Sequence, residues 1–239
     1  MQIRAAAQSA SAVQAIAVRT PVRPQATPLR SAPGAGADDL VRTIEMMGAA
    51  MPFARNAEIY GEGEPADYVY MLVSGAVRTT KVLDDGRRQV GAFYLPGDIF
   101  GLEAGEEHPF CAEAITVSTV VVVRRSALVA LAGCDADAAR QLWALTAREL
   151  DLVRAHMMQL IRTAQERVAC FLIEMAHRQA ASDRVELPMS RQDIADHLGL
   201  TIETVSRTFT QLADEATIAL PTHRRVVLRN RAALARLNS

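Results

Sequence analysis

Cysteine is scarce in the 239-residue sequence, and its placement argues against both a disulfide framework and a structural zinc site. Cys111, Cys134 and Cys170 are odd in number, lie far apart and form no Cys-x-x-Cys pair. Disulfide-stabilised folds and zinc ribbons use paired or closely spaced cysteines instead. We therefore expect ordinary thiols in a protein of the reducing cytoplasm.

Long apolar runs and a strong net charge are missing as well. A membrane-spanning helix needs roughly 20 apolar residues, so we expect no membrane association. The formal net charge is −1, which by itself indicates no polyanionic partner. The charges are unevenly distributed, however, because no acidic residue follows Glu215 while five arginines do. A local basic end is typical of a protein that binds phosphate groups at one place.

The residue groupings that enzymes use are also missing. The chain has no Ser/His/Asp grouping, no glycine-rich loop to hold phosphates and no metal-ligand spacing. Glu106, Glu107 and His108 could form a metal cluster, but a solvated loop explains them more simply. We therefore expect a protein that is not an enzyme, with no catalytic residue, no bound metal and no cofactor.

Residues 1–38 have the composition of a disordered tail. Alanine, serine, proline and arginine dominate, and no acidic residue occurs before Asp38. Four prolines, at positions 21, 24, 28 and 33, would interrupt any helix. The same composition imitates an organellar transit peptide, which is the alternative, but it lacks the apolar core of a secretory signal.

Residues 39–137 are predicted to form a β-roll or jelly roll. Short segments with alternating side chains follow one another at about ten-residue spacing, separated by glycine-containing turns. Tyr68–Val73 is one such segment, and Asp84-Asp85-Gly86 has the chemistry of a hairpin turn. A further alternating strand is expected from Ile115 to Val123.

Residues 138–162 are predicted to form a long helix that pairs with its copy in a homodimer. From Trp143 onward apolar residues recur at alternating steps of three and four, the period of a coiled-coil seam. The residues that we assign to the dimer interface are Leu150, Val153, Met157, Leu160 and Ile161. The alternative is a helix packed on its own β-domain, which needs a similar apolar stripe.

Residues 163–239 are predicted to form a winged helix-turn-helix domain. Thr163 and Glu166 have the capping-box spacing, which indicates that a new helix begins there. Near the end of the chain, the apolar segments 218–220 and 226–228 flank a polar turn, as the two strands of a wing do.

The central part of this domain carries the helix-turn-helix signal. Ser190 and Thr201 are each placed to cap a helix. Ala195 is small enough to let two helices cross closely, and Gly199, four residues later, suits the tight turn between them. A coincidental helical hairpin is the alternative.

The exposed face of the second helix is predicted to read DNA bases. Glu203, Ser206, Arg207 and Thr210 recur at i, i+3, i+4 and i+7 and therefore share one face. A guanidinium can bond both O6 and N7 of guanine, and a carboxylate can accept from the N4 amine of cytosine. We assign base reading to Glu203, Ser206 and Arg207, whereas Ile202 either touches a thymine methyl group or packs inside. The alternative for Glu203 and Arg207 is a simple exposed ion pair.

Contacts with the DNA backbone are expected from polar residues at the helix starts and from the wing. Such contacts position a protein on the duplex without specifying sequence. The residues assigned to this role are Ser190, Arg191, Thr201, Thr204, Thr210, His223, Arg224 and Arg225. A merely solvated basic face is the alternative for the wing arginines.

These motifs resemble those of the cyclic-AMP receptor/FNR superfamily of bacterial regulators, and within it the FixK-type branch. The resemblance covers roughly residues 40–239 and rests on Gly199–Arg207, on the wing, and on β-domain pieces such as Tyr70–Gly75 and Pro96-Gly97-Asp98. It implies an α+β fold with a β-roll, a dimerisation helix and a winged helix-turn-helix. It also implies a homodimeric transcription activator that binds palindromic double-stranded DNA with TTGAT-like half-sites.

The sequence departs from the superfamily where effectors bind. Cyclic-nucleotide binders place an arginine beside the phosphate, but Gly101-Leu102-Glu103 is followed here by two further carboxylates and no arginine. We therefore expect no cyclic nucleotide. The tail has no cysteine, and Val121 stands where FNR has its β-domain cysteine, so no iron–sulfur cluster is expected. The FixK-type branch implies control of micro-oxic, anaerobic or nitrogen-fixation genes without an obligatory effector.

Three alternatives stay open at this point. Asp85, Gly86 and Arg87 lie in a loop that resembles an RNA polymerase contact of FNR-like activators, and they fit a plain hairpin tip equally well. A thiol switch at Cys111 or Cys170 is the alternative to inert thiols. A regulator of the same fold that responds to a ligand other than a cyclic nucleotide is the alternative to an effector-free one.

Overall fold

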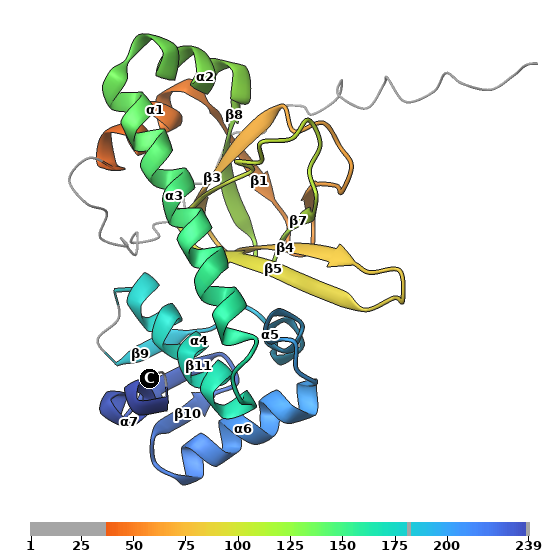
Figure 1. The fold of residues 1–239 in the computed structure, drawn as a ribbon, viewed down its shortest axis with the longest axis vertical. Helices are drawn as coiled ribbons and strands as arrows, with labels where there is room; N and C mark the ends of the chain where they lie inside the picture. Colours follow the sequence, from red (N-terminus) through yellow and green to blue (C-terminus); the bar gives the residue numbers. More distant parts are fainter. Residues whose placement is uncertain (1–36, 181–182, 238–239) are drawn as a thin grey trace, which may run out of the picture.

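Two antiparallel four-stranded sheets form the N-terminal domain. The computed structural model describes residues 37–180 and 183–237. One sheet has the order β1 (Ala49–Phe53), β8 (Ser118–Arg124), β3 (Tyr68–Ser74) and β6 (Ile99–Phe100). The other has the order β2 (Glu58–Tyr60), β7 (Cys111–Ala114), β4 (Val77–Val82) and β5 (Arg88–Tyr94). The predicted β-roll is thus confirmed (Figure 1).

The central strand β3 is buried on both faces. Val69 and Met71 belong to a core cluster shared with the covering helices. Tyr70 and Leu72 belong to a second cluster, which lies between the two sheets. Because successive side chains of a strand point to opposite faces, one run of apolar residues serves both cores.

The strand boundaries differ from the prediction in several places. The short strands β1, β2, β6 and β7 have no counterpart in the sequence analysis. The strand expected from Ile115 to Val123 is wrong at its start, because residues 115–117 form the turn between β7 and β8. The hairpin turn is confirmed, since Gly86 has a φ of 81° between the paired strands β4 and β5.

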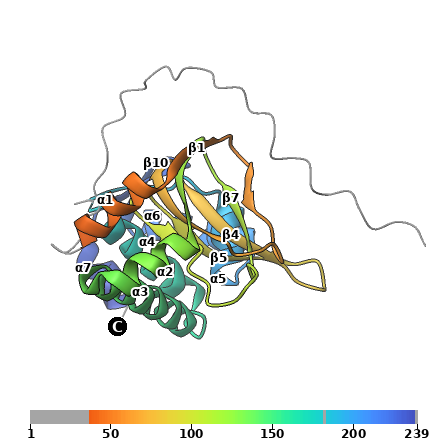
Figure 2. The same ribbon diagram turned by 90° about the horizontal axis from the view of Figure 1, so that it is seen from above.

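Three helices cover one side of the β-domain (Figures 1 and 2). They are α1 (Ala37–Met47), α2 (Arg125–Cys134) and α3 (Ala136–Gln159). The predicted tail lies outside the described residues, except for Ala37 and Asp38, which belong to α1. None of the described helices is both long and apolar enough to cross a membrane.

The long helix α3 has two distinct apolar stripes. Leu142 and Leu145 pack against the β-domain core. The residues of the predicted seam point elsewhere, and Trp143, Val153 and Met157 are 78%, 55% and 62% exposed. Packing of α3 on its own domain therefore does not use the seam.

The helix is shorter than the predicted range 138–162 at its C-terminal end. It ends at Gln159, so Ile161 lies in the turn beyond it. The backbone N–H of Thr163 donates to Glu166, whose own N–H donates to the Thr163 hydroxyl. This capping box begins the next helix and separates it from α3.

The C-terminal domain is a winged helix-turn-helix, as predicted. Its helices are α4 (Ala164–Arg178), α5 (Arg191–Leu198), α6 (Ile202–Asp214) and α7 (Arg231–Leu237). Its strands are β9 (Arg184–Glu186), β10 (Ile218–Thr222) and β11 (Arg225–Leu228), in the sheet order β10-β11-β9. The third strand, β9, has no counterpart in the sequence analysis.

The two domains share a hydrophobic core. Val90 and Phe93 of β5 are buried in the same cluster as Phe171 of α4 and Ile194 of α5. The Phe93 and Phe171 rings meet edge to face, with centroids 6.1 Å apart. The β4–β5 hairpin therefore supports the helix-turn-helix directly.

Candidate nucleic-acid interface

The turn between α5 and α6 has the backbone shape that a helix-turn-helix requires. The Asp193 N–H donates to the Ser190 hydroxyl at 3.1 Å, and the Ser190 N–H donates to the Asp193 carboxylate at 2.9 Å. Gly199 ends α5 in the left-handed region, at φ 62° and ψ 40°. Ala195 is fully buried where the two helices cross. These local predictions are confirmed.

Helix α6 is held by one face and leaves the other in solvent. Thr201 caps it, accepting a hydrogen bond from the Thr204 N–H at 3.2 Å. Val205, Phe209 and Leu212 are fully buried. In Figure 1, α6 lies at the end of the molecule away from the β-domain. Its polar side is therefore accessible to a large partner.

The predicted base-reading side chains all lie on this accessible side. Glu203, Ser206 and Arg207 are exposed, and Ile202 is 37% exposed at the first turn. In the described part of the chain, no ion pair within 4.0 Å joins Glu203 to Arg207. The backbone N–H of Glu203 and the Thr201 hydroxyl hold the pKa of Glu203 below its ordinary value. The surface thus presents a carboxylate and a guanidinium that are not bound to each other.

The threonines assigned to the DNA backbone already have local partners. The Thr210 hydroxyl donates to the carbonyl of Ser206 at 3.1 Å. The hydroxyl oxygens of Thr201 and Thr204 lie 3.1 Å apart. A phosphate oxygen would have to compete with these bonds, so the assignment of Thr201, Thr204 and Thr210 stays a prediction.

Arg191 does not occupy the position that its predicted role requires. Its guanidinium lies over the Phe209 ring, 3.3 Å from the centroid. Its Nη1 atom is buried and has no hydrogen-bond partner among the described residues. Burial lowers the pKa of Arg191 to about 10. The side chain packs α5 against α6 through a cation–π contact, which sequence spacing did not reveal.

The wing turn is confirmed, but its arginines differ from each other. His223 and Arg224 form the exposed tip between β10 and β11. Arg225 is turned back instead, and its Nε donates to Glu186 of β9 at 2.6 Å. Contact between Arg225 and a phosphate therefore has to replace an ion pair, whereas the Arg224 side chain is at the tip.

The predicted dimer residues lie on the outward stripe of α3 and just beyond it. Leu150 and Leu160 are 49% and 38% exposed, and Ile161, in the turn, is 77% exposed. Such a continuous apolar stripe is unusual on a solvent-facing helix. The homodimer assignment stays a prediction, and the two stripes of α3 support it.

Arg167 joins the turn between α3 and α4 to the helix-turn-helix. The sequence analysis missed this role. Its Nε donates to the carbonyl of Arg162 at 2.8 Å, and its guanidinium also reaches the carbonyl of Leu160. Its Nη1 donates to the carbonyls of Leu198 and Gly199 at 2.8 and 3.4 Å. No local motif marks this residue, because its partners lie in separate turns.

The loop after β6 is more buried than predicted. Glu106 and Glu107 are exposed, but His108 is 1% exposed and stacks on Tyr60, with ring centroids 3.7 Å apart. The solvated-loop interpretation is therefore wrong for His108. No group of three potential metal ligands occurs in the described ranges. Arg125 holds this loop by donating to the carbonyls of Glu103 and Gly105.

The structure also places the residues of the proposed polymerase loop and of the possible thiol switch. Asp85, Gly86 and Arg87 form an exposed tip, in which Arg87 Nε donates to Asp85 at 2.7 Å. Cys111 is half-buried and its sulfur accepts from the N–H of Glu62 at 3.2 Å. Cys170 is buried, and this burial raises its thiol pKa, which disfavours the reactive thiolate.

Comparison with known proteins identifies the family. Residues 166–237 match the Crp-like helix-turn-helix domain, and residues 50–133 match the cyclic nucleotide-binding domain. Over 215 residues the chain is 50% identical to the nitrogen fixation regulation protein FixK of Azorhizobium caulinodans, covering 86% of this chain and 87% of that protein. The chain belongs to the FixK family. This FixK-family protein is therefore a transcription regulator with a DNA-binding helix-turn-helix.

Two further relatives agree with this assignment. FixK of Rhizobium meliloti is 45% identical over 164 residues, covering 68% of this chain and 74% of that protein. The structure of FixK2 from Bradyrhizobium japonicum has 52% sequence identity and a TM-score of 0.77, covering 80% of this chain and 98% of that one. The FixK-type resemblance and the fold class expected from the sequence are both confirmed.

Proposed function

We propose that this protein activates transcription as a homodimer that binds palindromic DNA with TTGAT-like half-sites and needs no obligatory effector. We further propose that its targets are genes for growth at low oxygen, including nitrogen-fixation genes. The names of its FixK relatives support the physiological part. The proposed DNA recognition is supported by Glu203 and Arg207, which are both exposed on α6 and form no ion pair with each other.

In the proposed complex, α6 enters the major groove and reads one G·C pair with two side chains. Arg207 donates two hydrogen bonds to O6 and N7 of guanine, and Glu203 accepts one from N4 of the paired cytosine. Ser206, one turn from Ile202, faces a neighbouring thymine or phosphate. No Glu203–Arg207 ion pair within 4.0 Å has to be broken first, but the Glu203 carboxylate exchanges the hydrogen bonds from its own N–H and the Thr201 hydroxyl for one from the base.

Backbone contacts hold the same helix at the correct depth. Ser190 and Thr201 lie at the N-terminal ends of α5 and α6, where backbone N–H groups favour a phosphate. His223 and Arg224 extend from the wing tip to the backbone on the other side. These groups supply affinity that is independent of sequence and falls as salt rises.

Dimerisation through α3 supplies the two-fold symmetry of the site. Burying Leu150, Val153, Met157, Leu160 and Ile161 against a second copy would remove an exposed apolar stripe from water. A parallel pair of α3 helices would direct the two α6 helices to the same face of the DNA. Half-sites about one helical turn apart, roughly 34 Å, suit such a dimer.

The β-domain supports regulation without a cyclic nucleotide. The loop after β6 places the Glu103 carboxylate near His108, at 3.3 Å, where a bound phosphate would meet further negative charge. Tyr60 stacks on His108 and also lies 5.0 Å from the Tyr70 ring, so aromatic side chains fill this interior. We also propose that the exposed tip of Asp85, Gly86 and Arg87 contacts RNA polymerase, and that the protein has no catalytic activity.

Fluorescence anisotropy with labelled duplexes tests the proposal. The wild-type protein, with no small molecule added, is titrated against a TTGAT palindrome and against a scrambled duplex at physiological salt. Arg207→Ala should lose about 1–3 kcal/mol of binding free energy on the palindrome and lose its preference at one base pair. Arg224→Ala is the matched control, and it should weaken both duplexes alike.

Three results would count against the proposal. Equal wild-type affinity for the palindrome and the scrambled duplex would exclude sequence-specific reading. A uniform loss of affinity for Arg207→Ala would make Arg207 a phosphate contact. Binding that requires an added cell extract of small molecules would favour the effector-dependent alternative.

A further inference from the structure

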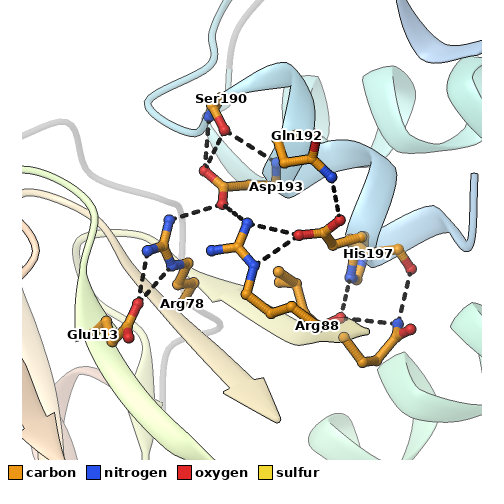
Figure 3. Close-up of polar contacts among 10 residues, drawn as sticks. Arg78, Arg88, Glu113, Ser190, Gln192, Asp193 and His197 are labelled. Atoms are coloured by element: carbon orange, nitrogen blue, oxygen red, sulfur yellow. Dashed lines mark hydrogen bonds and ion pairs between the residues drawn. The ribbon is translucent and has the colours of Figure 1, made fainter. Parts of the chain in front are cut away.

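Four charged side chains join the β4–β5 hairpin to α5, the first helix of the helix-turn-helix (Figure 3). Arg78 and Arg88 come from the hairpin, and Asp193 and Asp196 come from α5; we call these four residues the hairpin clamp. Arg78 Nη1 and Arg88 Nη2 each donate to Asp193 Oδ1 at 2.7 Å. Arg88 Nε donates to Asp196 Oδ2 at 2.7 Å. The clamp therefore connects residues more than a hundred positions apart in the chain.

The two carboxylates of the clamp are shielded from water, whereas the Arg88 side chain is 31% exposed. The side chains of Asp193 and Asp196 are only 3% and 11% exposed. The second carboxylate oxygen of Asp193 accepts from the Ser190 N–H and hydroxyl at 2.9 and 2.8 Å. Burial acts to raise the pKa of Asp193, but the Ser190 hydrogen bonds and the two arginines hold it below its ordinary value. An ion pair in such a place is poorly screened by salt, and removing one partner leaves an uncompensated buried charge.

Other contacts of the hairpin support α5 from the same side. The Val90 carbonyl lies 3.2 Å from Nδ1 of His197, and the amide of Gln89 donates to the His197 carbonyl at 3.4 Å. Away from the clamp, a further ion pair joins the domains, between Arg178 of α4 and Asp98 at 2.5 Å. The helix-turn-helix is thus fixed to the β-domain at two charged points with apolar packing between them.

The clamp leaves the reading surface uncovered. The hairpin contacts α5, whereas Glu203 and Arg207 on α6 are exposed. The clamp residues therefore do not block DNA in this structure. They hold α5, and α6 moves with α5 because the two helices share the buried crossing at Ala195.

We infer that the hairpin clamp is a positioning device that sets the separation of the two recognition helices in the dimer. The inference rests on the proposed binding of a palindrome by a homodimer. If α3 joins the two β-domains, each clamp then fixes its own α6 relative to that frame. Arg78 and Arg88 thus act on DNA affinity through α5, without contacting DNA.

A positioning role has a distinctive signature in DNA binding. One half-site needs only one α6, so its affinity does not depend on how the two α6 helices are spaced. A full palindrome needs both, and its extra affinity depends on the effective concentration of the second α6 at its half-site. Loosening the clamp lowers that effective concentration and leaves the half-site affinity unchanged.

The test compares full-length wild-type protein with Arg88→Met on two duplexes, the TTGAT palindrome and a single half-site. We expect the Kd for the palindrome to rise on the order of tenfold, and the Kd for the half-site to stay within about twofold. Asp196→Asn, which leaves the Arg88–Asp193 pair in place, should give the same pattern with a smaller loss. The double variant should be no worse than Arg88→Met alone. Arg87→Met is the matched control. Arg87 is the neighbouring arginine, its ion pair among the described residues is with Asp85 at the exposed tip, and its proposed partner RNA polymerase is absent from this assay.

Circular dichroism at the assay temperature verifies that each variant is folded. If Arg88→Met is not, Arg88→Lys replaces it, since lysine keeps the charge but cannot bridge both carboxylates; a smaller loss confined to the palindrome is then expected.

Unchanged palindrome affinity in Arg88→Met would overturn the inference, as would an equal loss on both duplexes, which would mean damage to the helix-turn-helix itself. Increased palindrome affinity would overturn it as well, because the clamp would then hold the recognition helices away from their binding positions. A wild-type protein that does not prefer the palindrome to scrambled DNA would overturn the proposed function instead, and the clamp with it.

Discussion

Replacing Gly199 by alanine tests whether the turn of the helix-turn-helix depends on backbone conformation or on space. Gly199 has φ 62° and ψ 40°. A Cβ atom placed there would lie 3.6 Å from Arg167 Nη1 and 3.7 Å from Leu160 Cδ2, which is ordinary van der Waals contact. Steric overlap therefore contributes nothing, and the cost comes from the left-handed conformation alone.

The expected loss of stability can be worked out from the conformational cost alone. Holding a non-glycine residue in the left-handed region costs about 1–2 kcal/mol. Alanine also reduces the conformational entropy of the unfolded chain, which stabilises the folded state by about 0.4–1 kcal/mol. Gly199→Ala should therefore lower the free energy of unfolding by about 1 kcal/mol. Gly199→Asn should cost less, because asparagine adopts this conformation more readily.

Urea denaturation followed by circular dichroism measures the effect. Gly86→Ala is the control, since Gly86 has φ 81° at the hairpin tip and a Cβ atom placed there would meet no other atom within 4 Å. Both alanine variants should lose similar stability. A loss above about 3 kcal/mol at Gly199 alone would point to crowding, and no loss would show that the turn tolerates any residue.

Three further predictions concern the dimer, the wing and a buried histidine. Val153→Glu should convert the dimer to monomer, because two carboxylates would meet across the seam; sedimentation that still shows a dimer would refute the α3 interface. Arg224→Ala should lower the slope of log Kd against log salt concentration by about one. Arg225→Ala should change this slope less, because Arg225 already forms an ion pair with Glu186. Burial lowers the pKa of His197 to about 3, far below its value in the unfolded chain, so the unfolded state binds more protons between these values. The free energy of unfolding should therefore fall by up to about 2 kcal/mol as the pH drops from 6.5 to 5; His197→Asn, which can still donate to the Val90 carbonyl, should flatten this dependence in urea titrations.

Features set by neighbouring residues were predictable from the sequence. The two capping boxes depend only on residues three apart, so Thr163 and Glu166, and Ser190 and Asp193, could be paired from spacing. The positive φ of Gly199 followed from the need for a tight turn. The exposed face of α6 followed from helical periodicity, because its opposite face is buried.

Features that depend on tertiary contacts could not be predicted in the same way. Arg191 is a basic residue at the start of a helix, which suggests a phosphate contact, yet the ring of Phe209 lies within reach only after α5 and α6 cross. Arg88 and Asp196 carry no shared signal, since 108 positions separate them. The strand β9 is only three residues long and forms because β11 offers it a free edge.

The shared core has a practical consequence for anyone who wishes to study the DNA reader in isolation. Val90 and Phe93 belong to the β-domain, yet they complete the packing around Phe171 of α4. A fragment starting at Thr163 would lack that cover and would leave an apolar, aggregation-prone patch in water. A soluble fragment would need polar substitutions on that patch. Alternatively, it would have to keep the β4–β5 hairpin so that the patch stays covered.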